Sequence, residues 1–400
     1  MTDDKLTGRR QWLGVATALG AALAACTRAE PAAEPSLLGR PVSSYGERSS
    51  FETAKRALPD TRYPETASSR TPLQDSCGIL TPSSLHYERH HAGIPRIDPA
   101  QHRLLIHGDV DRPTIFTVDE IKRLPSVSRI HFLECSGNSS IEWAGNGQNA
   151  AQSHGLASCS EWTGVPLSLL LSEAGIAKKA RWVIAEGADA CKMQRSLPIE
   201  KAMDDTLIAW GQNGEPLRPE QGYPLRLLVP GWEGNISVKW LRRLQAVEEP
   251  YMVRDETSHY TDLMPDGTAR IFTFLMEAKS LITFPSGGQK LKTPGFYEIT
   301  GLAWSGRGRV RRVEVSTDGG RSWREAPLQE PVLDKAFARF RLPWNWDGGE
   351  VELQSRCTDE SGYVQPSKEA LIAARGLNSQ YHYNGIKAWK IAAGGSVSHA

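Results

Sequence analysis

A strand that ends on a cysteine lies about one third of the way along the chain, in the segment His131-Phe132-Leu133-Glu134-Cys135-Ser136-Gly137-Asn138-Ser139. The apolar run before Cys135 predicts the strand, and the Gly-Asn pair after it predicts a turn. Such a geometry presents a thiolate among backbone N–H groups, and thiolates are soft ligands for metals. Taken alone, the segment is explained more simply by a buried cysteine beside a turn.

This segment belongs to a domain of mixed secondary structure, predicted for residues 71–250. Residues 166–175 have helical periodicity and end on a glycine, which predicts a short helix. The other predicted strands of this domain are 104–108, 129–133, 181–185 and 225–230. Short strands mixed with short helices are typical of an α+β domain.

A second domain is predicted for residues 286–375, after a connector at 251–285 without clean periodicity. Alternating apolar and polar residues predict strands, and Thr-Asp-Gly-Gly at 317–320 predicts a hairpin turn. The predicted strands are 296–304, 310–316, 337–342 and 351–357. Several short strands separated by turns predict an immunoglobulin-like β-sandwich. Residues 376–400 then form a C-terminal tail.

The N-terminus predicts export. Arg9-Arg10 precedes a short, uncharged apolar run that ends near Ala25, which is typical of a secretory leader. Paired arginines favour the twin-arginine route over an ordinary Sec leader, although Trp12 replaces the usual Phe. We therefore expect residues 1–26 to be an export signal, residues 27–70 to be a linker, and the protein to be periplasmic. Small residues before Cys26 also resemble a lipoprotein cleavage site, so a lipid anchor at Cys26 stays open.

The composition limits the function classes. The formal net charge is +1, which gives no support for nucleic-acid binding. Beyond the leader, no stretch is apolar and long enough to cross a membrane. None of the six cysteines forms a C-x-x-C pair, which argues against a zinc ribbon or c-type haem. Buried thiols are favoured for the remaining cysteines, with a Cys159–Cys191 disulfide as the alternative.

Two further segments carry groups that bind anions. The first is the Arg89-His90-His91 loop, where a guanidinium and imidazoles can clamp an oxyanion; a solvated polar loop explains it about as well. In the second, the predicted strand 225–230 runs into a Gly-rich loop followed by Ser237 and Lys239. Exposed N–H groups beside a lysine form a natural phosphate cradle, although most loops of this kind are solvent-exposed turns.

Together, these segments resemble the sulfite oxidase family of molybdopterin enzymes. The resemblance covers residues 71–375 and rests on four segments: the cysteine strand, the Arg-x-His loop, residues 224–240, and Ala-Trp-Ser-Gly-x-Gly-Arg at 303–309. Within the family, the chain is most similar to the molybdenum subunit of the sulfane dehydrogenases, which take part in thiosulfate oxidation. That closer likeness rests on residues 74–75, 88–93 and 258–267.

The resemblance implies a molybdenum-molybdopterin cofactor with Cys135 as the metal ligand. The residues that it places around the cofactor are His90, His91, Arg226, Ser237 and Lys239. Gln221 stands where the family usually has a histidine, which puts that position in doubt as a ligand because an amide carries no charge.

The resemblance also implies a substrate pocket formed by Arg89, Trp162, Tyr260 and Arg309. For Trp162, plain core packing is the alternative. Sulfite oxidases usually carry an arginine pair after the Cys-x-Gly-Asn turn, whereas Ser139 and Ser140 stand there in this chain. Losing a fixed positive charge is expected to weaken binding of free sulfite and to suit a bulkier substrate.

The implied activity is oxidation of a sulfur substrate by oxygen-atom transfer, with electrons passed to a cytochrome c. The substrate is a sulfur anion or a sulfane sulfur on a carrier protein, and the resemblance implies a homodimer or hetero-oligomer. Three alternatives stay open: a dehydrogenase of free sulfite, a periplasmic methionine sulfoxide reductase-like enzyme, and a non-catalytic β-sandwich binding module. The second domain argues against the reductase, and only the binding module predicts no metal.

Overall fold

The computed structural model describes residues 39, 41–377 and 379–400. The chain divides into two compact units, Met1–Thr53 and Ala54–Ala400, and every feature discussed below belongs to the second. The predicted export signal, Cys26 and the start of the predicted linker lie outside the described residues. No helix in the described part of the chain has the length and apolar character needed to span a bilayer.

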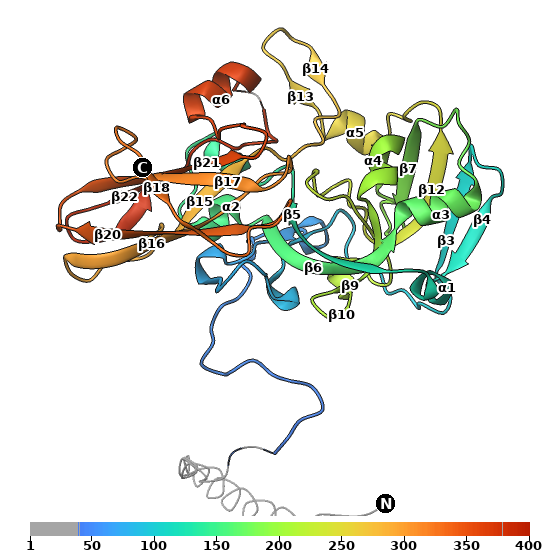
Figure 1. Cartoon of the computed structure of the whole chain (residues 1–400), viewed down its shortest axis with the longest axis horizontal. Helices are drawn as coiled ribbons and strands as arrows, with labels where there is room; N and C mark the ends of the chain where they lie inside the picture. Colours follow the sequence, from blue (N-terminus) through green and yellow to red (C-terminus); the bar gives the residue numbers. More distant parts are fainter. Residues whose placement is uncertain (1–38, 40, 378) are drawn as a thin grey trace, which may run out of the picture. The chain divides into compact units, whose positions relative to one another are not determined.

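The first domain contains two five-stranded sheets (Figure 1). One has the order β10 (Glu215–Pro216), β9 (Leu207–Gln212), β6 (Ala157–Pro166), β5 (Val127–Glu134), with β11 (Arg226–Leu228) also paired to β9. The other has the order β4 (Thr114–Thr117), β3 (Arg103–Gly108), β12 (Leu241–Val247), β7 (Trp182–Gly187), β8 (Gln194–Pro198). Only the β12–β3 pair of these sheets is parallel. Three predicted strands thus appear as β3, β5 and β7, and the fourth is the shorter β11.

Helices of the first domain are short. They are α1 (Val118–Arg123), α2 (Ala150–His154), α3 (Leu167–Ala174), α4 (Ile199–Asp204) and α5 (Arg254–Ser258). The predicted helix is α3: Leu167, Leu170, Leu171 and Ala174 recur at helical spacing, and all four are fully buried. It ends because Gly175 adopts a left-handed conformation with φ 72°.

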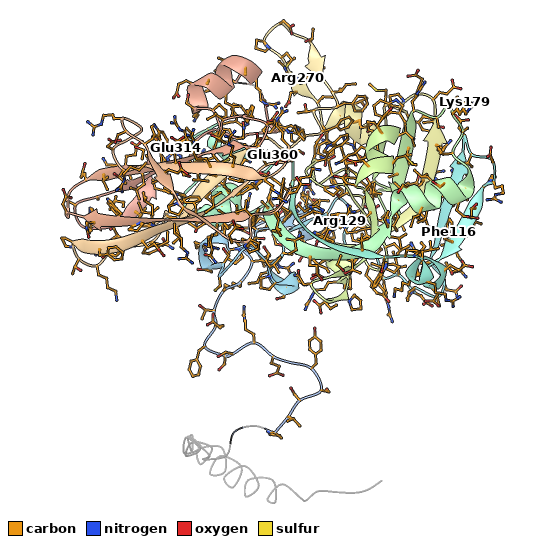
Figure 2. The ribbon with its side chains drawn as sticks, viewed as in Figure 1. Phe116, Arg129, Lys179, Arg270, Glu314 and Glu360 are labelled. Carbon is orange, nitrogen blue, oxygen red and sulfur yellow. The ribbon has the colours of Figure 1, made fainter. Side chains whose placement is uncertain are left out.

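The second domain is an antiparallel β-sandwich, as predicted. Its first sheet is β15 (Lys279–Phe284), β16 (Gly295–Trp304), β20 (Ala338–Trp346), β19 (Leu328–Gln329). Its second sheet is β18 (Arg324–Ala326), β17 (Val310–Ser316), β21 (Val351–Asp359), β22 (Ala388–Ile391), β23 (Val397–His399). Figure 2 labels Glu314 on this domain and Phe116 and Lys179 on the first.

The boundaries of the sandwich are wider than predicted. β15 lies inside the predicted connector, and β22 and β23 lie inside the predicted tail. β15 is buried on both faces, so it lacks the alternation that reveals a half-exposed strand. Two two-stranded pairs, β1 (Ser68–Ser69) with β2 (Glu88–Arg89) and β13 (Asp262–Leu263) with β14 (Ala269–Arg270), and helix α6 (Lys368–Arg375) complete the elements used below.

The two domains share one apolar core at the strand that carries the cysteine. Phe132 of β5 stacks on Phe337 with ring centroids 6.4 Å apart, and its N–H donates to the Lys335 carbonyl at 2.9 Å. The end of β5 is therefore held between the domains.

The five described cysteines are all free thiols, so the Cys159–Cys191 disulfide is not formed.

Candidate active site

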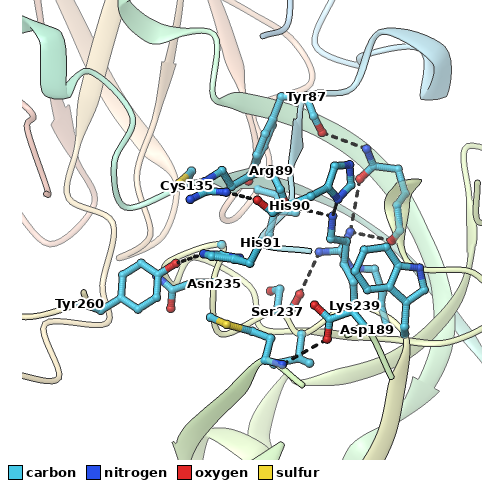
Figure 3. A pocket seen from close by; sticks show the side chains of 17 residues that line it. Tyr87, Arg89, His90, His91, Cys135, Asp189, Asn235, Ser237, Lys239 and Tyr260 are labelled. Carbon is cyan, nitrogen blue, oxygen red and sulfur yellow. Dashed lines mark hydrogen bonds between the residues drawn. The ribbon is translucent and has the colours of Figure 1, made fainter. Parts of the chain in front are cut away.

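One pocket collects most of the predicted site residues. It encloses about 630 Å³ including its opening to solvent, which is in the range of small-molecule sites. Eight of the ten predicted residues line it: Arg89, His90, His91, Cys135, Arg226, Ser237, Lys239 and Tyr260. Figure 3 shows how these side chains converge from separate strands and loops.

Cys135 follows the last residue of β5. Its N–H donates to the Leu156 carbonyl at 3.0 Å, and its carbonyl accepts from the Asn138 N–H at 2.8 Å. Ser139 closes the turn in a left-handed conformation with φ 64°. Withdrawal from water raises the pKa of the Cys135 thiol, while the nearby Arg89 guanidinium acts against this rise. The predicted strand-end thiol is thus present, beside a cation.

The Arg89-His90-His91 segment spans the pocket wall. Arg89 Nη1 donates to the Thr66 carbonyl at 2.9 Å, which fixes the guanidinium. His90 lies between two charged groups, with Nδ1 2.8 Å from Lys239 Nζ and Nε2 2.7 Å from a Glu88 carboxylate oxygen. His91 Nε2 lies 3.3 Å from the Tyr260 hydroxyl (Figure 3). Burial lowers the pKa of His91 to about 4, so this imidazole is neutral at physiological pH.

Two cations crowd the inner end of the pocket. Arg226 is buried and donates to the Gln221 carbonyl at 3.0 Å and the Ser237 carbonyl at 3.1 Å. Burial and, after it, the Arg226 charge lower the pKa of Lys239 to about 7, while Glu88 and Asp189 act in the opposite direction. Ser237 Oγ accepts from the Val229 N–H at 3.0 Å and so shapes the loop rather than neutralising charge. An anion bound here would relieve this repulsion.

Trp162 and Arg309 do not line this pocket. Trp162 is fully buried, donates to the His131 carbonyl at 3.2 Å, and lies under the Arg226 guanidinium with 4.9 Å to the ring centroid. Its observed role is to support Arg226. Arg309 lines a separate pocket with Lys335. Its backbone carbonyl accepts from the Glu360 N–H at 3.0 Å, which holds this turn on the sandwich. Its predicted contact with substrate is therefore not supported.

Several pocket residues were not predicted. Asn235 lies inside the Gly-rich segment and donates to Ser136 Oγ at 3.0 Å, so its position in that segment was an available signal. Asp189 comes from the loop between β7 and β8 and carries no sequence signal. Tyr381, from the predicted tail, has its ring centroid 5.5 Å from that of Tyr260. It lines a side pocket beside Gly137 and Ser140, and none of the residues lining that pocket is charged.

The comparisons with known proteins agree with this geometry. Residues 91–254 match the model of the oxidoreductase molybdopterin binding domain, and residues 270–388 match that of the Mo-co oxidoreductase dimerisation domain. The solved structure of the sulfane dehydrogenase SoxCD from Paracoccus pantotrophus has a TM-score of 0.88 and 44% identity, covering 93% of this chain and 97% of that one.

Curated relatives are longer proteins. Mitochondrial sulfite oxidase of Drosophila melanogaster is 31% identical over 77% of this chain and 59% of its own length. NADH nitrate reductase 1 of Arabidopsis thaliana is 32% identical over 77% of this chain and 38% of its own length. The chain thus spans well under two thirds of these relatives.

The pocket fits the cofactor that these families share. It offers a soft thiolate donor in Cys135 and the buried basic groups of Arg226 and Lys239. A molybdenum-molybdopterin needs both, since its metal takes thiolate sulfur and its phosphate takes basic groups. Both domains, the pocket and the matched structure lead to one conclusion: the chain belongs to the sulfite oxidase family of molybdenum-molybdopterin oxidoreductases.

Proposed function

We propose that the protein oxidises a reduced sulfur substrate, with sulfane sulfur on a carrier protein favoured over free sulfite, and passes the electrons to a cytochrome c. The observation that carries this proposal is the side pocket beside the cysteine turn: Arg89 lies near Cys135, whereas the side pocket lined by Ser140 and Tyr381 has no charged lining residue. Without a cation on that side, a small anion is bound less tightly. The likeness to a sulfane dehydrogenase supports the same substrate class.

The pocket residues have separate proposed roles in binding the cofactor and the substrate. Cys135 would ligate the molybdenum, and Arg226, Lys239 and His90 would hold the pterin phosphate. When bound, the cofactor supplies two-electron oxygen-atom transfer. Arg89 orients the anionic end of the substrate, and the Tyr260 hydroxyl, 3.3 Å from the neutral His91 imidazole, can donate a hydrogen bond to charge that develops on the product.

The proposed setting is the periplasm, reached by the twin-arginine route. The predicted linker at 27–70 would act as the tether of the mature protein over its part before Ala54, where the second compact unit begins, and Cys26 would be the site of any lipid anchor. A dimerisation domain supports assembly into an oligomer. A cytochrome c, free or as a bound subunit, is proposed as the electron acceptor.

Steady-state oxidation assays of the natively purified protein test this function. Sulfite, thiosulfate and a persulfide on a small carrier protein serve as donors, with cytochrome c as acceptor, and nitrate reduction serves as the control activity. The proposal predicts a higher kcat/KM for the carrier persulfide than for sulfite. A higher value for sulfite would identify a sulfite dehydrogenase, and turnover of nitrate alone would contradict sulfur oxidation.

A further inference from the structure

Two buried carboxylates of the loop around the cysteine are each paired with a lysine from the sandwich side of the molecule. Glu134 precedes Cys135 and lies 2.5 Å from Lys279 Nζ, while Glu142 follows it in the loop and lies 2.8 Å from Lys387 Nζ. All four side chains are at most 4% exposed. Lys279 begins β15, and Lys387 immediately precedes β22.

The pair at Glu134 is connected directly to the cysteine. One Glu134 carboxylate oxygen accepts from Lys279 and from Asn138 Nδ2 at 2.8 Å, and the other accepts from Trp304 Nε1 at 2.7 Å. Asn138 in turn donates its N–H to the Cys135 carbonyl at 2.8 Å. Every partner of this carboxylate is therefore either in the cysteine turn or on a strand of the sandwich.

The pair at Glu142 has the same composition but a different position. Lys387 also donates to the Gly147 carbonyl at 3.1 Å, and its ammonium lies 4.5 Å from the Trp389 ring centroid. These contacts hold the far end of the loop, beyond the turn that contains the cysteine. Glu142 also has His399 Nε2 at 3.3 Å. The two lysine–glutamate pairs thus match in burial and in the side of the molecule that supplies the lysine, and they differ in their link to Cys135.

We propose that Lys279 and Trp304 are positioning residues for the molybdenum ligand: they fix the Glu134 carboxylate and, through it and Asn138, the orientation of Cys135 Sγ. Groups that orient a ligating side chain tune a metal site and its activity, because small displacements change metal–ligand overlap. The sandwich then has a role at the metal centre in addition to association between chains. This inference rests on the cofactor and not on the proposed substrate.

The test compares Lys279→Met with Lys387→Met in the full-length holoenzyme. Each variant removes the lysine from one buried glutamate, and Glu142 keeps His399 Nε2 at 3.3 Å, so we expect both to lower the thermal midpoint, Lys279→Met by at least as much as Lys387→Met. Only Lys279→Met should shift the g-values of the Mo(V) electron paramagnetic resonance signal after dithionite reduction, and it should lower kcat by about tenfold or more. Because dithionite supplies the electrons for the Mo(V) signal, the expected shift of its g-values does not depend on the substrate assignment.

Two further variants keep the test decisive if Lys279→Met does not fold. Glu134→Gln/Lys279→Gln removes both charges and keeps a hydrogen-bonding pair, and Trp304→Phe removes one donor to Glu134 while keeping the charge. We expect each to shift the Mo(V) signal away from that of the wild type, whereas Lys387→Met should leave it unchanged. A wild-type signal in both, or an equal shift in Lys387→Met, would overturn the proposal.

Discussion

The pocket and the sandwich core are stabilised in opposite ways. The sandwich buries Trp304, Phe340, Leu353 and Trp389 completely, and even the Trp389 N–H has a partner, the Ile282 carbonyl at 3.0 Å. The pocket instead buries Arg226 and Lys239, and burial and the Arg226 charge outweigh the opposing effect of Glu88 and Asp189 on the pKa of Lys239. Apolar packing dominates the interior of the sandwich away from the Lys279 and Lys387 ion pairs, whereas the pocket is completed by an anionic ligand. Variants in the two regions should therefore separate stability from activity.

Cys135→Ser should show the largest difference between loss of activity and loss of stability. Loss of the metal ligand should lower activity roughly a thousandfold or more, because metal-centred stabilisation of the transition state is worth several kcal/mol. The thermal midpoint should stay close to that of the wild type, because the substitution removes no core side chain. Cys77→Ser, at an exposed free cysteine, is the matched control and should keep full activity. Retained turnover in Cys135→Ser would contradict the assignment.

Phe340→Ala should give the reverse pattern. Phe340 is fully buried, and a Cβ added at Gly301 would lie 2.1 Å from its ring, so the contact is tight. Truncation should cost about 3–5 kcal/mol of unfolding free energy in a denaturant titration. Molybdenum per folded molecule should not change. A loss of molybdenum together with the loss of stability would show that packing in the sandwich core and cofactor binding in the pocket are coupled, which would contradict this prediction.

The pocket cations predict a pH dependence of the cofactor-free protein. The folded pKa of Lys239, about 7, lies below its ordinary value of 10.5, so between these values the unfolded chain binds a proton that the folded protein lacks. Stability should therefore rise with pH across this window, by at most about 1.4 kcal/mol per pH unit, and be lowest below pH 7.

Urea unfolding of the cofactor-free wild type and Lys239→Met at pH 7 and 8.5 measures this difference. From pH 7 to 8.5 the free energy of unfolding should increase less in Lys239→Met than in the wild type, because the methionine side chain does not titrate. Equal increases in the two proteins would mean that Lys239 is not under the electrostatic strain described here.

The smallest effect is expected in the uncharged side pocket that Ser140 lines. Ser140→Arg restores a cation at the uncharged side and should lower the KM for free sulfite severalfold, a gain of about 1 kcal/mol. Ser140→Gln, of similar length but neutral, is the control and should leave that KM near the wild-type value. An unchanged or higher KM in the arginine variant would argue against charge as the basis of specificity.

Much of the fold could be predicted because its periodic signals are local. The α3 helix has clean helical spacing and a glycine stop, and β16, β17 and β21 alternate. β15 was missed because a strand buried on both faces has no alternation. β22 and β23 were missed because they are short and follow a helix, so only the pairing of β22 with β21 and of β23 with β22 identifies them as part of the sandwich.

The site could be predicted where its residues lie in contiguous motifs. Cys135, Arg89 and Lys239 come from such motifs, and the structure brings them together. Trp162 and Arg309 were placed by resemblance, and the structure puts the first under Arg226 and the second in another pocket. Asp189 and Tyr381 reach the site only through tertiary structure, which no local pattern reports.

X-ray absorption at the molybdenum edge tests the central claim most directly, because it counts the sulfur atoms bound to the metal. With two sulfurs from the pterin, the wild-type holoenzyme should show a third that is absent from Cys135→Ser. An identical sulfur count in the two proteins would mean that Cys135 does not bind the metal.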